Sequence, residues 1–245
     1  MDSGYYAAYA GYVARTQALD AAADNLANAQ TVGYRAEREN FRSVLLDPLQ
    51  GNSQLGSTVN NYGVVHGDQL DMSQGALTAT GNPLDLAIQG EGFFATQTPD
   101  GVRYTRNGGF HRSNTGVLIN GSGDPVLSAQ SRPIVIPPGE IAVGDDGVIS
   151  VDGGAVAVVG VFAFPKGTQL TPEGTNRYRA PDKVKTALAA SPVHSHALES
   201  SNQDPITGST KLIVMQRQAE TMQKALTIFH LDFNKTAAED LPRVV

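Results

Sequence analysis

The sequence predicts an α+β fold in which two long terminal helices, paired like a coiled coil, carry an inserted and mainly antiparallel β-domain. Two observations support this prediction. Apolar residues recur at heptad spacing near each end of the chain. Between these ends, short apolar stretches alternate with turns that contain Gly, Pro and Asn, a pattern typical of antiparallel strands. We therefore expect a helix in 1–34, a connector in 35–81, a β-rich outer domain in 82–195 and a helix in 196–245 that packs with 1–34.

The opening helix is expected over residues 3–29. Its apolar seam, with steps of seven residues on two adjacent positions, consists of Tyr5, Tyr9, Tyr12, Leu19 and Leu26. Frequent alanines favour helix and allow close approach of another backbone. Gly33 is expected to end this segment, because glycine adopts the left-handed conformation that follows many helices.

The closing helix is expected over Thr207–Thr236 and is the organising element of this prediction. Asp204 is a good N-cap residue and Pro205 suits the first helical position. The seam steps by three and four residues through Leu212, Met215, Ala219, Met222, Leu226, Phe229 and Phe233. A helix of this length spans about 45 Å at about 1.5 Å per residue, so it needs a partner along its length.

Two interpretations of these helices remain open. Each helix either covers one face of a central core, or the two form a stalk that packs on itself and on other subunits. Both seams are narrow and no short loop joins them, which favours the stalk. Polar residues between the seam positions, among them Gln216, Gln218 and Gln223, are then inter-subunit or channel-facing positions.

The middle of the chain changes from a connector to strands. Residues 35–50 are expected to form a short helix or an arm, and residues 51–80 an extended segment with short strands. From Asn82 onward, turns separate strand candidates at roughly ten-residue intervals, which indicates an antiparallel sandwich or irregular barrel. The candidates are residues 84–88, 93–97, 102–106, 117–119, 148–151 and 156–164.

The composition excludes several classes of protein. The chain has 245 residues, a net charge of −6 and no cysteine. The acidic balance argues against nucleic acid as a partner, and the lack of cysteine excludes disulfides and thiolate metal sites. No apolar run reaches the length of a membrane span, and residues 1–19 lack the pattern of a cleaved signal peptide.

No catalytic or metal-binding set emerges from the motifs. His194 and His196 alternate on a short segment, but no third ligand follows at a recognisable spacing. Asp145, Asp146 and Asp152 lie in turns and lack the calcium-loop pattern. Scattered carboxylates, namely Asp85, Glu91 and Asp100, are not placed together by any pattern. We therefore expect no enzyme activity, no cofactor and no metal.

Three motifs in order resemble the axial proteins of the bacterial flagellum. Residues 24–34 (DNLANAQTVGY) resemble the N-terminal signature, through Asn25, Leu26, Asn28 and Gly33. Residues 82–94 (NPLDLAIQGEGFF) and 104–110 (YTRNGGF) are similar to the body of the rod and hook members, through Asn82, Pro83, Leu84, Asp85, Gly90, Gly92, Phe93, Phe94, Tyr104, Thr105 and Arg106. Residues 198–202 (LESSN) match the C-terminal signature, through Leu198, Glu199, Ser201 and Asn202. Asp24 and Tyr34 depart from the commoner Asn and Phe.

The resemblance implies a structural role. Such proteins are exported by the flagellar type III apparatus without a cleaved signal and assemble, through their terminal helices, with themselves and other rod subunits. The product is a hollow periplasmic rod that transmits torque. The length and the first residues are most similar to the proximal-rod type, with the distal-rod type or another hook-family axial subunit as the alternative. A binding module for cell-wall or ring components is a further alternative, and a wall hydrolase is a third class.

The domain organisation predicts a pattern of protease sensitivity. Terminal helices bury little apolar surface until neighbours cover them, so they are expected to be cleaved first in the purified monomer. Limited proteolysis with mass spectrometry should leave a resistant core near residues 82–192. Uniform resistance of the whole chain would contradict this organisation and favour one continuous globule.

Overall fold

The computed structural model describes residues 2–43, 63–174, 176–182 and 184–239. The chain divides into two compact units. The first unit comprises Met1–Leu26, Glu37–Gln69 and Pro205–Val245, and the second comprises Ala27–Ala36 and Leu70–Asp204. The boundaries predicted from the sequence at 34/35, 81/82 and 195/196 remain a prediction.

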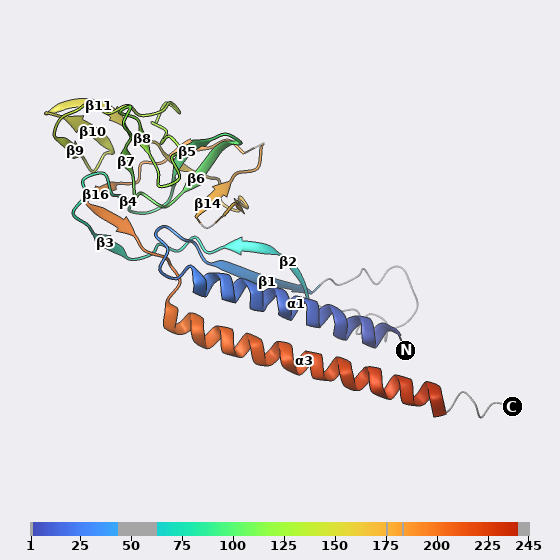
Figure 1. Ribbon diagram of the computed structural model, residues 1–245. Coiled ribbons are helices and arrows are strands. Elements are labelled where there is room, and N and C mark those ends of the chain that lie inside the picture. Colours follow the sequence, from blue (N-terminus) through green and yellow to red (C-terminus); the bar gives the residue numbers. More distant parts are fainter. Residues whose placement is uncertain (1, 44–62, 175, 183, 240–245) are drawn as a thin grey trace. The chain divides into compact units, whose positions relative to one another are not determined.

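The first unit contains both helices and a strand pair. These elements are α1 (Asp2–Ala27), β1 (Glu37–Ser43), β2 (Gly63–Leu70) and α3 (Pro205–Glu239). The two helices run in opposite directions (Figure 1). Helix α3 begins at Pro205 as predicted, since the fixed φ of proline suits the first helical position. The short helix that was one expectation for 35–50 is wrong where it is described, because residues 37–43 form strand β1; the alternative of an arm remains a prediction.

The buried face of α1 differs from the predicted seam. Its buried residues are small or polar, namely Ala14, Ala18, Ala21, Ala22 and Asn25. This spacing makes one helical stripe, but a stripe offset from the predicted one. Tyr9 is exposed, and Tyr12, Leu19 and Leu26 are only partly buried. The side chain of Tyr5 lies outside the described residues.

The predicted fold class is therefore wrong. A coiled coil requires large apolar knobs from both helices, whereas the buried stripe of α1 consists mainly of alanine. The two helices account for only 24% of the chain, and most of the fold is a β-rich body. The small alanine side chains allow the close backbone approach that was expected of them, but they also form the buried stripe itself.

The second unit is the β-rich body. Its strands with described register pair in antiparallel fashion. They are β3 (Leu77–Ala79), β4 (Leu86–Ile88), β5 (Phe93–Thr98), β6 (Gly101–Thr105), β7 (His111–Arg112), β8 (Leu118–Ile119), β9 (Ile141–Val143), β10 (Val148–Val151), β11 (Gly154–Val158), β12 (Val161–Ala163), β13 (Thr171–Pro172), β14 (Arg177–Arg179), β15 (Ala187–Leu188), β16 (Val193–Ser195) and β17 (Ala197–Glu199).

Six strands form the largest sheet, in the order β13-β14-β6-β5-β12-β15. A three-stranded sheet has the order β11-β10-β9, and the two-stranded ribbons include β16-β4 and β17-β3. The strand expected over 156–164 is divided in the structure into the end of β11 and the whole of β12. Gly160 lies at this break, where a Cβ would approach the carbonyl oxygen of Ser128 to 2.7 Å.

The main core of this unit is aliphatic and aromatic. Leu86, Ile88 and Phe94 are fully buried within it, and the ring of Phe94 meets that of Phe110 edge-on at 5.1 Å. All three residues of β4 and five of the six residues of β5 are buried, so these strands contribute residues from both faces to the interior. The ribbons β16-β4 and β17-β3 bring residues 193–199 beside residues 77–88, although more than a hundred positions separate them in the chain.

Candidate functional site

The most distinctive site of the β-rich unit is a buried ion cluster of Arg35, Arg106 and Glu199, here called the Glu199 cluster. The side chains of Arg35 and Glu199 are each 1% exposed, and that of Arg106 is 3% exposed. Charged residues are rarely buried to this degree unless they are paired. Contacts among these three side chains must therefore compensate for the burial of their charges.

Each member of the cluster comes from a different part of the chain. Glu199 ends strand β17, Arg106 directly follows strand β6, and Arg35 lies in the segment that follows α1. The pairing of β17 with β3 fixes Glu199 in register opposite Leu77. All three residues belong to the second unit, so its internal packing alone creates the cluster.

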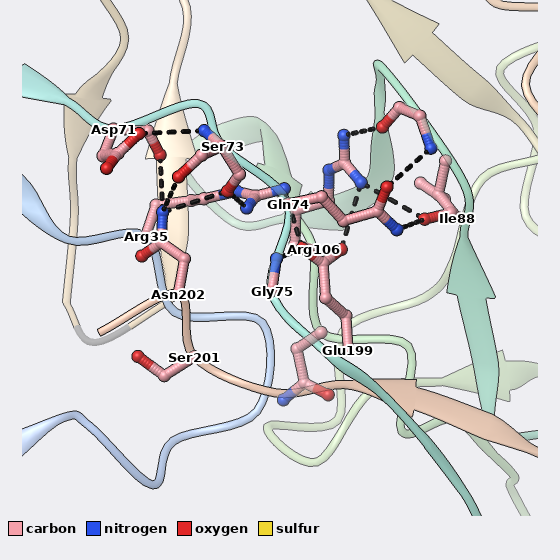
Figure 2. Close-up of polar contacts among 12 residues, drawn as sticks. Arg35, Asp71, Ser73, Gln74, Gly75, Ile88, Arg106, Glu199, Ser201 and Asn202 are labelled. Carbon is pink, nitrogen blue, oxygen red and sulfur yellow. Dashed lines mark hydrogen bonds and ion pairs between the residues drawn. The ribbon is translucent and has the colours of Figure 1, made fainter. Parts of the chain in front are cut away.

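The Glu199 carboxylate binds both arginines (Figure 2). Its Oε1 lies 2.8 Å from Nη2 of Arg35, and its Oε2 lies 3.0 Å from Nη1 of Arg106. The backbone N–H of Gly75 also donates to Oε1 at 2.9 Å. The backbone carbonyl of Glu199 accepts a hydrogen bond from Gly33 N–H at 2.7 Å. One residue thus joins four segments through its side chain and its backbone.

Backbone carbonyls and an aromatic ring also contact the guanidinium group of Arg106. Its Nη2 donates to the carbonyl of Gly90 at 2.6 Å, and its Nη1 is 3.5 Å from the carbonyl of Ile88. The guanidinium carbon lies 5.2 Å from the centre of the Phe93 ring, within the range of a cation–π interaction. These contacts tie the turn before β5 to the end of β6.

Arg35 is anchored at both its backbone and its side chain. Its backbone N–H donates to the Tyr178 hydroxyl at 3.0 Å, and its Nη1 donates to the carbonyl of Ser73. The Nε atoms of Arg35 and Arg106 are buried and have no hydrogen-bond partner among the described residues. The cluster therefore keeps two cations in place through their terminal nitrogens, around one anion.

Asn202 fastens the same segments a short distance away (Figure 2). Its Oδ1 accepts from the backbone N–H of Ala36 at 2.8 Å. Its Nδ2 donates to the carbonyls of Asp71 and Ser73 at 2.9 and 3.0 Å. A side-chain amide that uses both of its ends on backbone groups replaces hydrogen bonds that a strand ladder would otherwise provide.

Glycines allow the backbones around the cluster to approach closely. A Cβ on Gly75 would lie 2.0 Å from the carbonyl oxygen of Ser200, and one on Gly108 would lie 1.7 Å from that of Leu86. Gly33 has φ of +69°, and a Cβ there would lie 2.2 Å from the backbone nitrogen of Asn107. The left-handed conformation expected at Gly33 is therefore present, and it brings residues 33–35 against residues 106–107.

Burial lowers the pKa of Arg106 to about 10; Glu199 opposes this shift and Arg35 adds to it. The side chain is still protonated at neutral pH, so the Glu199 cluster carries two positive charges and one negative charge. Because the folded-state pKa of about 10 lies below the ordinary value of arginine, the unfolded chain binds more protons at pH values between the two. The cost of burying this charge is thus fully present below pH 10 and is lost as the pH rises through that window.

The structure brings part of the family motifs together and leaves the rest apart. Gly33, Gly90, Phe93, Arg106, Glu199 and Asn202 meet in or around the cluster. Leu84 and Phe94 belong to the main core, and the Thr105 hydroxyl donates to the carbonyl of Asn176 at 2.7 Å. The remaining motif residues lie outside the cluster, namely Asn25, Leu26, Asn28, Asn82, Pro83, Asp85, Gly92, Tyr104, Leu198 and Ser201.

Two asparagines of the motifs organise turns elsewhere. Asn25 uses both ends of its side chain on the backbone of Glu37, with distances of 2.8 and 2.9 Å. It thereby fixes the start of β1 against the end of α1. Asn82 donates to the Asp85 carboxylate at 2.8 Å and accepts from the N–H of Leu84 at 3.2 Å.

Sequence reasoning missed Arg35, Gln74, Gly75 and Tyr178 as parts of this site. Its position directly after Gly33-Tyr34 could have identified Arg35 as part of the site. Because further charged residues follow it, the segment was interpreted as an exposed arm. Gln74 links the carbonyl of Ile88 to the N–H of Gly90 through its two ends, at 2.8 and 3.0 Å. No local pattern marks Gln74, because its partners lie more than ten residues away.

The candidates for metal binding and catalysis lie apart from the cluster. His194 has Nε2 at 2.7 Å from Oε1 of Gln89 and Nδ1 at 3.5 Å from the Asp145 carboxylate. Within the described ranges, no group of three or more His, Cys, Asp or Glu residues is placed to hold a metal ion. The Asp146 and Asp152 carboxylates accept from the backbone N–H groups of Val148 and Glu140, as turn residues commonly do.

The predicted seam residues of α3 share one side of the helix. Ala219 is buried, and Leu212, Met215, Met222 and Leu226 are partly buried. The side chains of Phe229 and Phe233 lie outside the described residues. In the helical segments that the structure describes, neither α1 nor α3 has the combined length and hydropathy needed to cross a membrane.

Comparison with known proteins shows that the chain is similar to proteins of the bacterial flagellum. Residues 87–151 match the flagellar hook protein FlgE/F/G D1 domain, which covers β5 to β10 and includes Arg106. The chain is 33% identical to the flagellar basal-body rod protein FlgF of Caulobacter vibrioides, over 100% of both chains. The chain belongs to the family of flagellar basal-body rod proteins.

Further relatives carry related names. The FlgF protein of Salmonella typhimurium is 33% identical over 96% of this chain and 98% of its own length. The flagellar basal-body rod protein FlgG of Bacillus subtilis is 33% identical over 85% of this chain and 88% of its own length. Membership of this family makes the chain a structural subunit of the basal-body rod, as the sequence motifs predicted.

The geometry predicts that Glu199→Gln destabilises the β-rich unit strongly. The amide retains the size of the carboxylate, yet it leaves two buried guanidinium groups without a countercharge. Breaking a buried ion pair from one side costs about 3–5 kcal/mol of unfolding free energy. Urea unfolding of the purified chain, followed by the near-ultraviolet circular dichroism of its tyrosines, measures this loss.

Glu140→Gln is the matched control, because Glu140 is exposed. It removes the same charge and is expected to change the unfolding free energy by less than about 0.5 kcal/mol. A loss of less than about 1 kcal/mol for Glu199→Gln would show that the arginines do not depend on this carboxylate.

Proposed function

We propose that the chain is the FlgF-type subunit of the proximal rod, exported by the type III apparatus without a cleaved signal. Its copies assemble with one another and with other axial subunits into the hollow periplasmic rod that transmits torque. The observation that carries this proposal is the similarity to proteins named FlgF along the whole chain. A place in the distal rod is the second candidate, because FlgG of Bacillus subtilis is equally identical over a smaller share of the chain.

The exposed surface of α3 supports assembly with neighbours. Ile206, Ile213, Ile228 and Leu231 are all more than half exposed. On a helical wheel these residues lie opposite the seam that contains Ala219 and Leu226, so α3 has apolar residues on two opposite sides. Apolar side chains gathered on a free helix face are typical of an interaction surface.

The Glu199 cluster supports a mechanical role. Residues 27–36 follow α1 in the chain, and residues 199–204 precede α3. The cluster and Asn202 bind these two segments to each other and to the β-rich body. A subunit that carries torque needs the segments next to its helices fixed in this manner, and a buried ion network is expected to be stiffer than an exposed one.

Deletion of the gene from its native host is predicted to abolish swimming, and re-expression of the chain to restore it. Isolated basal bodies, analysed by mass spectrometry and electron microscopy, should contain the protein in the rod. A basal body that holds a complete rod without this chain would contradict the proposal. If the distal rod is the correct location, basal bodies from the deletion strain will still contain the proximal rod.

Charges placed on the partly buried seams are predicted to block assembly. Leu19→Asp on α1 and Leu226→Asp on α3 put a carboxylate where an apolar side chain, worth about 1.5–3 kcal/mol when buried, lies against its neighbours. Rod incorporation and motility should be lost while the circular dichroism of the β-rich unit is unchanged.

Neighbouring exposed positions provide the controls for this test. Gln17→Asp and Thr227→Asp add the same charge at residues that are exposed on the same helices. Both are expected to keep motility. Normal swimming with Leu19→Asp or Leu226→Asp would show that these seam residues have no role in assembly.

A further inference from the structure

A cavity of about 370 Å³ lies between the two helices of the first unit. One residue of α1 and five of α3 line this space, here called the α1–α3 slot: Arg15, Val214, Arg217, Gln218, Thr221 and Met222. The helices are close at the next turn, since a Cβ on Gly11 would lie 2.9 Å from the terminal methyl group of Met222. Among the described residues, those that line the slot come from α1 and α3.

The lining of the slot has a definite chemistry. Each helix contributes one arginine, so positive charge from Arg15 and Arg217 enters the slot from two sides. Val214 and Met222 supply apolar surface. The Oε1 atom of Gln218 is buried and has no hydrogen-bond partner among the described residues. An occupant with a carboxylate for Arg217 and a nearby N–H or O–H donor for Gln218 suits this lining, and a polypeptide offers both.

The outer side of α1 carries a suitable acidic residue. Asp20 is exposed and lies on the opposite side of the helix from the buried Ala18 and Ala22. Ala23 and Tyr9 share this outer side, and Tyr9 is 52% exposed. Because Asp20 points away from the buried stripe, its charge is available to another molecule.

We propose that the α1–α3 slot receives the Asp20 side chain of a second copy of this chain, whose α1 packs antiparallel to α3. The inference rests on the proposed self-assembly and deepens it by naming the contact. A carboxylate beside the guanidinium group of Arg217 forms charge-assisted hydrogen bonds, which are stronger than neutral ones.

The register of this contact is supported by residues far from the slot. Tyr9 lies eleven residues before Asp20, and Ile228 lies eleven residues after Arg217. Eleven residues span about 16 Å of helix, so antiparallel packing that joins Asp20 to Arg217 also places Tyr9 beside Ile228. Ile228 is 58% exposed, so the same register covers two large exposed side chains at once.

The same register also places two further exposed residues near the slot, Ala23 and Val214, opposite each other. Ala23 lies three residues after Asp20 and falls beside Val214, which lies three residues before Arg217 and is 45% exposed. A small residue opposite a branched one allows the helices to come close. In one alignment, Tyr9, Asp20 and Ala23 of α1 therefore lie opposite Ile228, Arg217 and Val214 of α3, respectively.

The direction of the helices makes the contact repeatable. Within one copy α1 and α3 run in opposite directions (Figure 1). Two copies that point the same way therefore present the α1 of one antiparallel to the α3 of the next. This contact joins different surfaces of the two copies, so it repeats from copy to copy rather than closing a two-fold dimer.

Cysteine cross-linking tests the contact directly, because the chain has no cysteine of its own. Asp20→Cys and Arg217→Cys chains with different tags are co-expressed in the deletion strain, and intact basal bodies are oxidised mildly. We expect a disulfide-linked dimer that contains both tags, since cysteines with Cα atoms within about 7 Å can be bridged. Each variant expressed alone should give little dimer.

Lys224→Cys is the matched register control. Lys224 is exposed on the same side of α3 as Arg217, one heptad further along. Paired with Asp20→Cys, it lies about 10 Å out of register and should form at least about tenfold less mixed dimer. Equal cross-linking of both pairs would overturn the proposed register.

Exchange of the charges provides a second, independent test. Arg217→Glu should reduce rod incorporation, because it places a carboxylate against Asp20 of the next copy. Asp20→Arg added to the same chain should restore incorporation, which a purely structural role for Arg217 would not produce.

The outcomes separate this contact from the proposed function. Rods that contain the protein but give no Asp20–Arg217 cross-link and no charge-exchange rescue would overturn the slot and leave the proposed function intact. Absence of the wild-type chain from the rod would overturn the proposed function itself. If Arg217→Glu fails to fold, the cross-link alone decides, because cysteine is a mild substitution at two exposed positions.

Discussion

The buried ion pairs of Glu199 are the interaction on which the rest of the β-rich unit depends. A carboxylate and two guanidinium groups removed from water are costly, and only their mutual contacts make this burial acceptable. The cost has a structural consequence, because Arg35 or Arg106 would be a buried charge without a countercharge if Glu199 were displaced. The segments before strand β3, after strand β6 and around strand β17 are therefore fixed together.

This constraint explains the distribution of unusual residues around the site. Backbones that converge on one carboxylate come too close for side chains, so Gly75 and Gly108 lie against carbonyl groups. Gly33 turns the chain after α1 toward the cluster through its positive φ. Residues from each of the family signatures therefore meet at this site, which agrees with the structural role of the rod proteins to which the chain belongs.

The two helices show where periodicity was informative and where it was misleading. On α3 the predicted seam is the less exposed side of the helix, because burial of its apolar side chains is favourable. On α1 the spacing of the large side chains predicted the wrong side of the helix as the buried one. Ala14, Ala18, Ala21 and Ala22 are buried instead, because a neighbouring backbone selects small residues for close approach rather than the most hydrophobic ones. The outer side of α1, including Tyr9 and Asp20, is thereby left for other contacts.

The sequence by itself determined the family, the antiparallel strands of the β-rich body, the start of α3 at Pro205 and the conformation of Gly33. These features follow from local patterns of proline, glycine and alternating apolar residues, which act over a few positions. Only the tertiary structure decided that Glu199 meets Arg35 and Arg106, which lie 164 and 93 positions away in the chain. It also decided which side of α1 is buried. Partners at such separations are chosen by strand pairing and by the cost of unbalanced buried charge, and neither is encoded in a local pattern.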